Sequence, residues 1–186
     1  DTFVVDSLLD LVSELPDGGL DRVLSSVSHA LGANLENLIL TGLLSIQGTG
    51  NALPNNITGN DGDNLLDGGA GADTLAGGGG DDIFVVDDGG DSIAASAGTD
   101  TVRSSRPSFT LGAGFEHLQL FGNAATGTGN LADNQLTGGL GNDTLDGGNG
   151  RDSSVYPGKR IDYTITQLST TEFAITNKAT GERDQL

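Results

Sequence analysis

Residues 59–85 read GNDGDNLLD GGAGADTLA GGGGDDIFV, which is three consecutive units of nine residues. Each unit begins with Gly, has Gly again at its fourth place, Asp or Asn at its sixth and a large apolar residue at its eighth. The sixth-place residues are Asn64, Asp73 and Asp82, and the eighth-place residues are Leu66, Leu75 and Phe84. A flexible Gly/Asp-rich linker has no reason to keep apolar residues at this strict spacing. The stretch therefore predicts a folded repeat.

The nine-residue spacing predicts one turn and one strand per unit. Six residues rich in Gly and Asp form a tight turn, and three residues with an apolar centre form a short strand whose middle side chain points inward. Two units then complete one coil of a flattened solenoid, so units two apart in sequence stack on each other. We expect residues 59–67 to face residues 77–85, and residues 68–76 to face the weaker unit at residues 50–58.

Stacked turns bring carboxylates and backbone carbonyls together, and Ca²⁺ takes six to eight such oxygen ligands. Without a cation the stacked Asp side chains would repel one another. The predicted stacking pairs Asn64 with Asp82 on one edge and Asn55 with Asp73 on the other. We expect about two cation sites in this part of the chain, one on each edge.

A second cluster spans residues 129–155 and reads GNLADNQLT GGLGNDTLD GGNGRDSSV. Its first and third units would face each other, which pairs Asn134 with Asp152. Asp143 lies in the best unit but has no obvious partner two units away. Ser154 occupies the apolar place of the third unit, which indicates that the solenoid is ending.

This tandem pattern resembles the hemolysin-type calcium-binding nonapeptide, GGxGxDxUx, of the RTX family. The resemblance implies an all-β fold, a right-handed parallel β-roll or β-helix solenoid with Ca²⁺-binding turns, and Ca²⁺ as the cofactor. The metal-binding residues that it implies are Asn55, Gly59, Asp61, Asp63, Asn64, Gly68, Ala70, Ala72, Asp73, Gly77, Gly79, Asp81, Asp82, Asn134, Gly138, Leu140, Asn142, Asp143, Gly147, Asn149 and Asp152.

The charge balance agrees with a cationic partner. The formal net charge is −18, and residues 59–88 hold eight Asp and no Lys or Arg. Phosphate binding needs Lys and Arg, so nucleic acid and an anionic membrane surface are poor partners. No apolar run approaches membrane-spanning length, so no membrane insertion is expected. The chain has no Cys, which excludes a thiolate metal site and disulfides.

A long internal repeat organises the rest of the chain. LGANLENLILTG at residues 31–42 resembles LGAGFEHLQLFG at residues 111–122, and residues 47–59 resemble residues 126–138. Both long segments are expected to add solenoid rungs whose turns lack metal ligands. We divide the chain into first long-repeat rungs (1–50), a first nonapeptide cluster (51–88), second long-repeat rungs (89–128), a second nonapeptide cluster (129–155) and a C-terminal cap (156–186).

The two ends of the chain differ from the repeats. The spacing of Leu8, Leu11 and Leu15 suits one face of a short helix, but the equivalent stretch of the second copy has no apolar stripe, so a loop or short strand is favoured. Residues 163–168 and 173–177 alternate in polarity around a polar connection, which predicts an antiparallel hairpin that caps the final rung. Because the chain has no Met, we expect it to be a piece of a longer protein.

Catalysis has little support in the sequence. Neither the HExxH zinc motif nor the GxSxG nucleophile elbow occurs. His29 and His117 are not repeated between the two copies, which favours surface or packing roles. We therefore expect no enzyme activity in this chain.

The leading functional hypothesis is a calcium-dependent folding module of a secreted, extracellular bacterial protein. The resemblance implies that such a module stays unfolded at low cytosolic calcium, passes through a type I secretion channel and folds outside. An adhesive module that binds polysaccharide or another surface ligand is the alternative from a different class. The non-catalytic tail of an exported lipase or protease is a third possibility, and it is compatible with the first.

Overall fold

The structure is a computed structural model that describes residues 1–156, 163–167 and 173–185. These residues form β-strands and turns and contain no helix. Within them, therefore, no helix is long and apolar enough to cross a membrane. The chain forms two compact units, residues 1–101 and 102–186. Each unit is built from parallel strands that coil into a β-solenoid, as the nine-residue spacing predicts.

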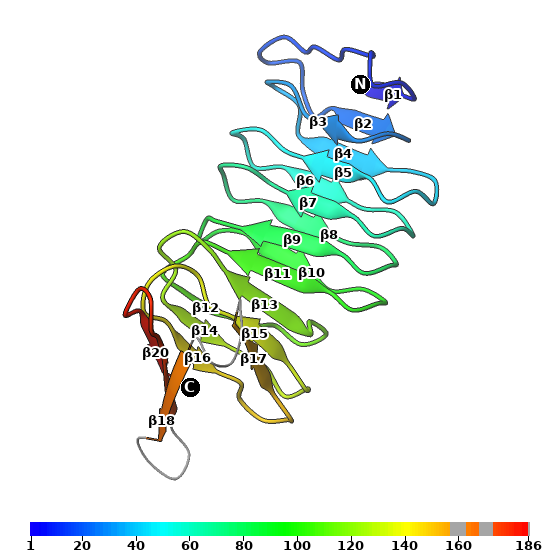
Figure 1. Ribbon diagram of the computed structural model, residues 1–186. Coiled ribbons are helices and arrows are strands. Elements are labelled where there is room, and N and C mark those ends of the chain that lie inside the picture. Colours follow the sequence, from blue (N-terminus) through cyan, green and yellow to red (C-terminus); the bar gives the residue numbers. More distant parts are fainter. Residues whose placement is uncertain (157–162, 168–172, 186) are drawn as a thin grey trace. The chain divides into compact units, whose positions relative to one another are not determined.

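The first unit consists of two parallel sheets, and the chain alternates between them in most of the unit (Figure 1). One sheet has the order β1 (Thr2–Val5), β2 (Arg22–Ser25), β4 (Asn37–Leu40), β6 (Asn56–Thr58), β8 (Thr74–Ala76) and β10 (Ser92–Ala94). The other has the order β3 (His29–Ala30), β5 (Gln47–Thr49), β7 (Leu65–Asp67) and β9 (Ile83–Val86). The long segment before the nonapeptides therefore supplies rungs of the solenoid.

The strand register confirms the predicted stacking of units two apart. Leu66 pairs with Phe84 across β7 and β9, and Ile57 pairs with Leu75 across β6 and β8. One coil of the nonapeptide region is therefore 18 residues long. The coils before it vary, since Arg22 of β2 pairs with Asn37 of β4.

The core of the first unit is a column of eighth-place side chains. Ile57, Leu66, Leu75 and Phe84 are each fully buried, because alternate strand residues point to the same side. Each such side chain contributes about 1.5–3 kcal/mol through its burial. The residues on either side of it in the strand are exposed or half-buried, so a three-residue strand has only one core position.

The second unit continues the same architecture. One sheet has the order β11 (Thr101–Ser104), β13 (His117–Leu120), β15 (Gln135–Thr137) and β17 (Ser153–Val155). The other has the order β12 (Ser108–Thr110), β14 (Thr126–Thr128), β16 (Thr144–Asp146), β20 (Arg183–Gln185), β19 (Phe173–Asn177) and β18 (Tyr163–Gln167). Its buried core residues include the eighth-place Leu136 and Leu145, and Leu118, which pairs with Leu136.

The C-terminal hairpin is confirmed, and the structure adds a strand to it. β18 and β19 pair antiparallel, while residue 168 of the first predicted run and the proposed connection (169–172) lie outside the described part of the chain. β20 then pairs antiparallel with β19 and parallel with β16, where Gln185 lies opposite Thr144. β20 thus occupies the position of the next solenoid rung, which the sequence analysis did not foresee.

The leucine-rich segment near the N-terminus is a loop rather than a helix. Residues 6–21 contain no regular element. Leu9 and Leu11 are 89% and 96% exposed, so no apolar stripe packs against the solenoid. The structure therefore agrees with the comparison between the two copies, which favoured a loop or short strand over the helical spacing.

Candidate metal centres

Glycine shapes the turns in which the acidic residues lie. Gly78 and Gly80, at the second and fourth places, have φ values of 102° and 98°, which L side chains rarely adopt. At the first place the limit is space: a Cβ on Gly77 would overlap Oδ2 of Asp82, and a Cβ on Gly59 would overlap the carbonyl oxygen of Gly77. These glycines therefore allow side-chain and backbone oxygens to converge inside each turn.

Sixth-place residues form two hydrogen-bonded rows in the first unit, one on each edge. The Asn64 ladder consists of Asn64, Asp82 and Asp100: the backbone N–H of Asn64 donates to Oδ1 of Asp82 at 2.8 Å, and that of Asp82 donates to Oδ1 of Asp100 at 3.0 Å. The same pattern links every neighbouring pair because successive coils are in register. All three side chains are buried.

The opposite edge carries the Asn55 ladder, which consists of Asn55, Asp73 and Asp91. The backbone N–H of Asn55 donates to Oδ1 of Asp73 at 2.7 Å, and that of Asp73 donates to Oδ1 of Asp91 at 3.1 Å. Asn55 and Asp73 are buried, and Asp91 is half-buried. The structure thus brings together both pairs that the sequence predicts and extends each by one acid.

The first residue of each ladder is an Asn, whose side-chain amide donates a hydrogen bond to the coil before the ladder. The Nδ2 of Asn55 donates to the carbonyl of Leu35 at 2.9 Å, and the Nδ2 of Asn64 donates to that of Ile46 at 3.0 Å. Both carbonyls belong to the preceding coil, outside the nonapeptides. A carboxylate has no donor for such a carbonyl, so the amide is the suitable residue at the boundary between the two kinds of coil.

The ladders concentrate buried negative charge. Burial raises the pKa of Asp82 to about 6, with further contributions from the charges of Asp100 and Asp63, although the hydrogen bond from Asn64 opposes the shift. The pKa of Asp73 is raised chiefly by burial and then by nearby acids, of which Asp91 contributes most. Oδ2 of Asp73 is also buried with no hydrogen-bond partner. Such a group is costly unless a cation neutralises it.

The donor set fits a hard divalent cation. Carboxylate oxygens, an amide oxygen and backbone carbonyls are the ligands that Ca²⁺ prefers. The unpartnered oxygen of Asp73 and the space kept free by the first-place glycines lie in the same turns. Sixth-place residues and first-place glycines would hold the ion, which would supply the positive charge that the ladders lack.

Other predicted site residues lie around the ladders rather than in them. Oδ1 of Asp63 accepts from the N–H of Asp81 at 2.9 Å, and Oδ1 of Asp81 accepts from that of Thr99 at 2.7 Å, so fifth-place acids link neighbouring turns at the surface. The exposed side chains at the remaining predicted positions include those of Asp61, Ala70, Ala72, Leu140, Asn142 and Asn149. At Ala70, Ala72 and Leu140, only backbone oxygens can serve as ligands.

The sequence analysis missed Asp91 and Asp100. Both fall in the segment that was expected to lack metal ligands, whereas the structure places both carboxylates in the ladders. A signal existed, because each lies 18 residues after a sixth-place Asp of the first cluster. The repeat phase therefore continues beyond residue 88 at the ligand positions, although the glycine pattern weakens there.

The second unit contains the predicted pair and one that was not predicted. The N–H of Asn134 donates to Oδ1 of Asp152 at 2.9 Å, so these two residues are brought together, with Asp152 exposed at the end of the row. Asp143, for which no partner was expected, donates its N–H to Oδ1 of Asp184 at 2.8 Å. This partner lies 41 residues away, far from the repeat spacing.

Another acidic group lies on the edge of the first unit, before the nonapeptides. One carboxylate oxygen from each of Asp1, Glu14 and Asp21 lies within 4.8 Å of the others. Asp21 is fully buried, its Oδ2 has no hydrogen-bond partner, and its N–H donates to Oε2 of Glu36 at 2.9 Å. Asp1, Asp21 and Glu36 each directly precede the first residue of a strand, and these first residues pair with one another across β1, β2 and β4. The ladder residues Asn55 and Asp73 precede paired strands in the same way.

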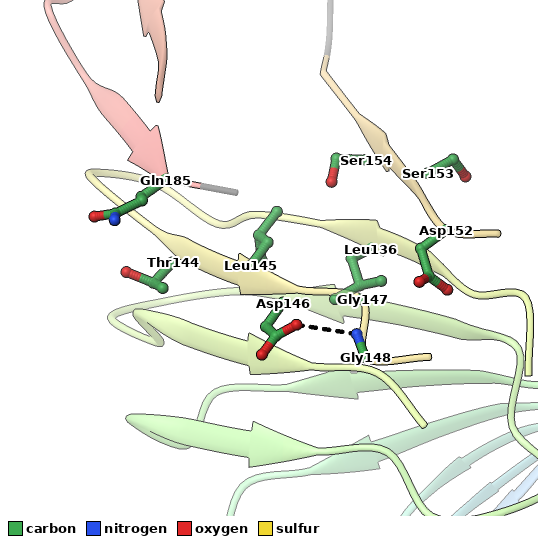
Figure 2. Close-up of a pocket in the computed structure, with 10 residues that line it drawn as sticks. All are labelled: Leu136, Thr144, Leu145, Asp146, Gly147, Gly148, Asp152, Ser153, Ser154 and Gln185. Carbon is green, nitrogen blue, oxygen red and sulfur yellow. Dashed lines mark hydrogen bonds between the residues drawn. The ribbon is translucent and has the colours of Figure 1, made fainter. Parts of the chain in front are cut away.

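The last rungs of the second unit enclose a pocket of about 530 Å³ (Figure 2). Leu136 and Leu145 line it from the core, and Figure 2 shows Ser154 of β17 and Gln185 of β20 at opposite sides of it. Ser154 is half-buried where earlier coils have a buried apolar residue. The prediction that the regular core ends at this unit agrees with this arrangement.

Comparison with known families identifies the repeats. A family model described as the RTX calcium-binding nonapeptide repeat matches four copies, over residues 49–84 and 126–153. No curated protein and no solved structure matches the chain. The matched residues include the pairs Asn55–Asp73, Asn64–Asp82 and Asn134–Asp152, while Asp91, Asp100 and Asp184 lie outside them. The family implies Ca²⁺ binding, and residues 49–84 and 126–153 are therefore RTX-type calcium-binding repeats, which form a parallel β-roll.

Proposed function

We propose that the chain is a non-catalytic calcium-dependent folding module of a secreted bacterial protein. RTX repeats typify secreted bacterial proteins and suggest a calcium-binding module. In this proposal the chain stays unfolded at the low calcium concentration of the cytosol and leaves through a type I secretion channel. It folds outside the cell, where calcium is abundant.

The observation that supports this proposal is the burial of uncompensated acids along both edges. Asp82 is fully buried in one ladder, and the buried Oδ2 of Asp73 has no partner in the other. Residues 59–88 supply no Lys or Arg to neutralise them. Taking charges out of water without a counter-charge costs several kcal/mol per ion. The same carboxylates become stabilising once a cation lies among them.

Calcium binding then contributes directly to folding. Ladder residues from different coils meet only in the folded chain, so the ion binds the folded state and hardly the unfolded one. The stabilisation per site is RT ln(1 + [Ca²⁺]/Kd), and extracellular modules have Kd values of roughly 10⁻⁴–10⁻³ M. Cytosolic calcium is far below this range. The same sequence would therefore change state between the two compartments.

The ladder architecture also predicts cooperativity and selectivity. Asp73 and Asp82 each have a ladder residue on both sides. A cation bound between one pair of neighbours therefore orders an Asp side chain that also serves the next pair. Contacts between successive coils transmit this order along a solenoid. A ligand set of carbonyl and carboxylate oxygens suits the variable geometry of Ca²⁺ better than the strict octahedron of Mg²⁺.

The test is circular dichroism of the full chain in EDTA, titrated with CaCl₂ and separately with MgCl₂. We expect a cooperative coil-to-β transition with Ca²⁺ and little response to Mg²⁺. Asp82→Asn removes a buried ladder charge and is expected to raise the calcium midpoint. The matched control Asp88→Asn removes an exposed charge from the same repeat cluster and is expected to leave the midpoint nearly unchanged. A complete β signal in EDTA would overturn the proposal.

A further inference from the structure

We propose that the C-terminal residues 181–185 and the turn at residues 138–143 form a divalent-cation site that fixes β20 onto the β-roll. Asp143 and Asp184 provide the carboxylates. The site takes a hard cation of the calcium type, and in that respect the inference rests on the proposed function. It adds a partner from outside the matched repeats, Asp184, to the matched turn that holds Asp143, together with a role for the C-terminal strand.

The hydrogen bonds around Asp184 reproduce those of a ladder residue. The N–H of Asp143 donates to Oδ1 of Asp184 at 2.8 Å, compared with 2.7 Å from Asn55 to Asp73 and 2.8 Å from Asn64 to Asp82. The following residue, Gln185, donates its N–H to the carbonyl of Asp143 at 2.7 Å. Asp184 therefore occupies a position equivalent to the sixth place of a repeat, although 41 residues rather than 18 separate it from Asp143.

The second observation is an unmet buried carboxylate. Asp143 is 2% exposed, and among the described residues only the backbone N–H of Gly139 acts as a donor toward its carboxylate, whose oxygens make no further hydrogen bond. Burial raises its pKa to about 6, and the charges of Asp184 and Glu182 add to the shift. A buried carboxylate with one backbone donor and a second carboxylate beside it is what a cation-binding turn needs and what an ion-free turn avoids.

The surrounding turn leaves space for an ion. A pocket of about 110 Å³ lies beside the turn and is lined by Gly138, Gly141, Glu182 and Asp184, among others, whereas Asp143 lies behind Gly138 and does not line it. A Cβ on Gly138 would lie 2.6 Å from Oδ2 of Asp143, so only glycine keeps this side of the carboxylate open. Oε1 of Glu182 accepts from the N–H of Gly141 at 3.1 Å, which holds a third carboxylate beside the site.

The site gives the C-terminal strand a calcium-dependent attachment. β20 joins β16 to β19, so whatever holds β20 also holds the antiparallel strands at the end of this sheet. Without a cation, Asp143, Glu182 and Asp184 repel one another across this junction. With one, the same residues hold the C-terminal segment on the final turn of the roll.

The experiment compares full-length wild type with Asp184→Asn in saturating CaCl₂. Isothermal titration counts the bound calcium ions, and hydrogen–deuterium exchange reports protection of residues 173–185. Asn is a conservative replacement because native Asn residues occupy equivalent ladder positions at Asn55 and Asn64. The control Asp146→Asn changes the same charge in the same unit, at an exposed side chain that accepts from the N–H of Gly148.

We expect Asp184→Asn to bind one calcium ion fewer and to lose at least tenfold protection in residues 173–185, while residues 50–100 stay protected. Asp143→Asn removes the other carboxylate and is expected to give the same two losses, whereas Asp146→Asn retains both properties. If both Asp143→Asn and Asp184→Asn bind as many calcium ions as the wild type and show the same protection, this inference is overturned while the proposed function stands. Absence of calcium binding to wild type would instead overturn the proposed function as well.

Discussion

Replacing Asp73 by Asn separates the metal-binding role of the ladder from its packing role. Asp73 is buried at the centre of the Asn55 ladder, where it faces Asn55 on one side and Asp91 on the other. Asn has the same shape, keeps an oxygen for the N–H of Asn55, and occurs naturally at other ladder positions. The substitution therefore removes one charge and little else.

The expected effect depends on calcium. With a Kd of about 10⁻⁴ M and 10 mM Ca²⁺, one site contributes roughly 2.7 kcal/mol. Asp73 can serve one cation toward Asn55 and another toward Asp91. The substitution is therefore expected to cost about 3–5 kcal/mol of stability in the calcium-bound state, which lowers the Tm by at least about 10 °C. In EDTA the sign changes: burial raises the pKa of Asp73, so its charge opposes the ion-free fold, and Asn is expected to be neutral or stabilising.

The assay is thermal unfolding followed by circular dichroism in 10 mM CaCl₂ and in EDTA. Asp88→Asn is the control, since it changes the net charge equally at an exposed side chain. An equal loss of stability for Asp73→Asn in both buffers would refute the reasoning, because it would assign Asp73 a packing role. Unchanged stability in calcium would also refute it.

Three further predictions concern the turn, the core and pH. Gly77→Ala puts a Cβ against Oδ2 of Asp82, so isothermal titration is expected to show at least about tenfold weaker calcium binding at the affected site; unchanged affinity would contradict this. Leu75→Ala is expected to cost about 2–5 kcal/mol in calcium, whereas Leu11→Ala, at a 96% exposed side chain, is expected to stay within about 0.5 kcal/mol in the same denaturant titration. Calcium affinity is expected to fall as pH drops through about 6, because Asp82 and Asp143 then become protonated. The ion-free fold has the opposite dependence: it binds more protons than the unfolded chain between pH 3.8 and about 6, so any residual structure in EDTA is expected to weaken as pH rises through this window, as circular dichroism can measure.

Much of the fold follows from the sequence because each nonapeptide combines a turn signal with one core position. The eighth-place residues Leu66 and Phe84 had to stack if two units make one coil, and their pairing confirms it. The alternating polarity of the C-terminal segment predicted β18 and β19 for the same reason: strand periodicity is local. Local patterns of this kind need no knowledge of distant contacts.

The missing parts of the site have two different physical origins. Asp91 and Asp100 keep the 18-residue spacing, so extending the ladder, rather than requiring the complete glycine motif, would have found them. Asp184 could not be found in this way. The hairpin strands β18 and β19 lie between it and Asp143, and only strand pairing in three dimensions brings β20 next to β16.

The most direct test of the central claim is to locate the ions by anomalous diffraction from crystals grown in CaCl₂. The account predicts anomalous peaks beside the buried sixth-place carboxylates, between Asn64 and Asp82 on one edge and between Asn55 and Asp73 on the other. Peaks confined to exposed acids such as Asp61 and Asp88, with the two ladders free of ions, would contradict it.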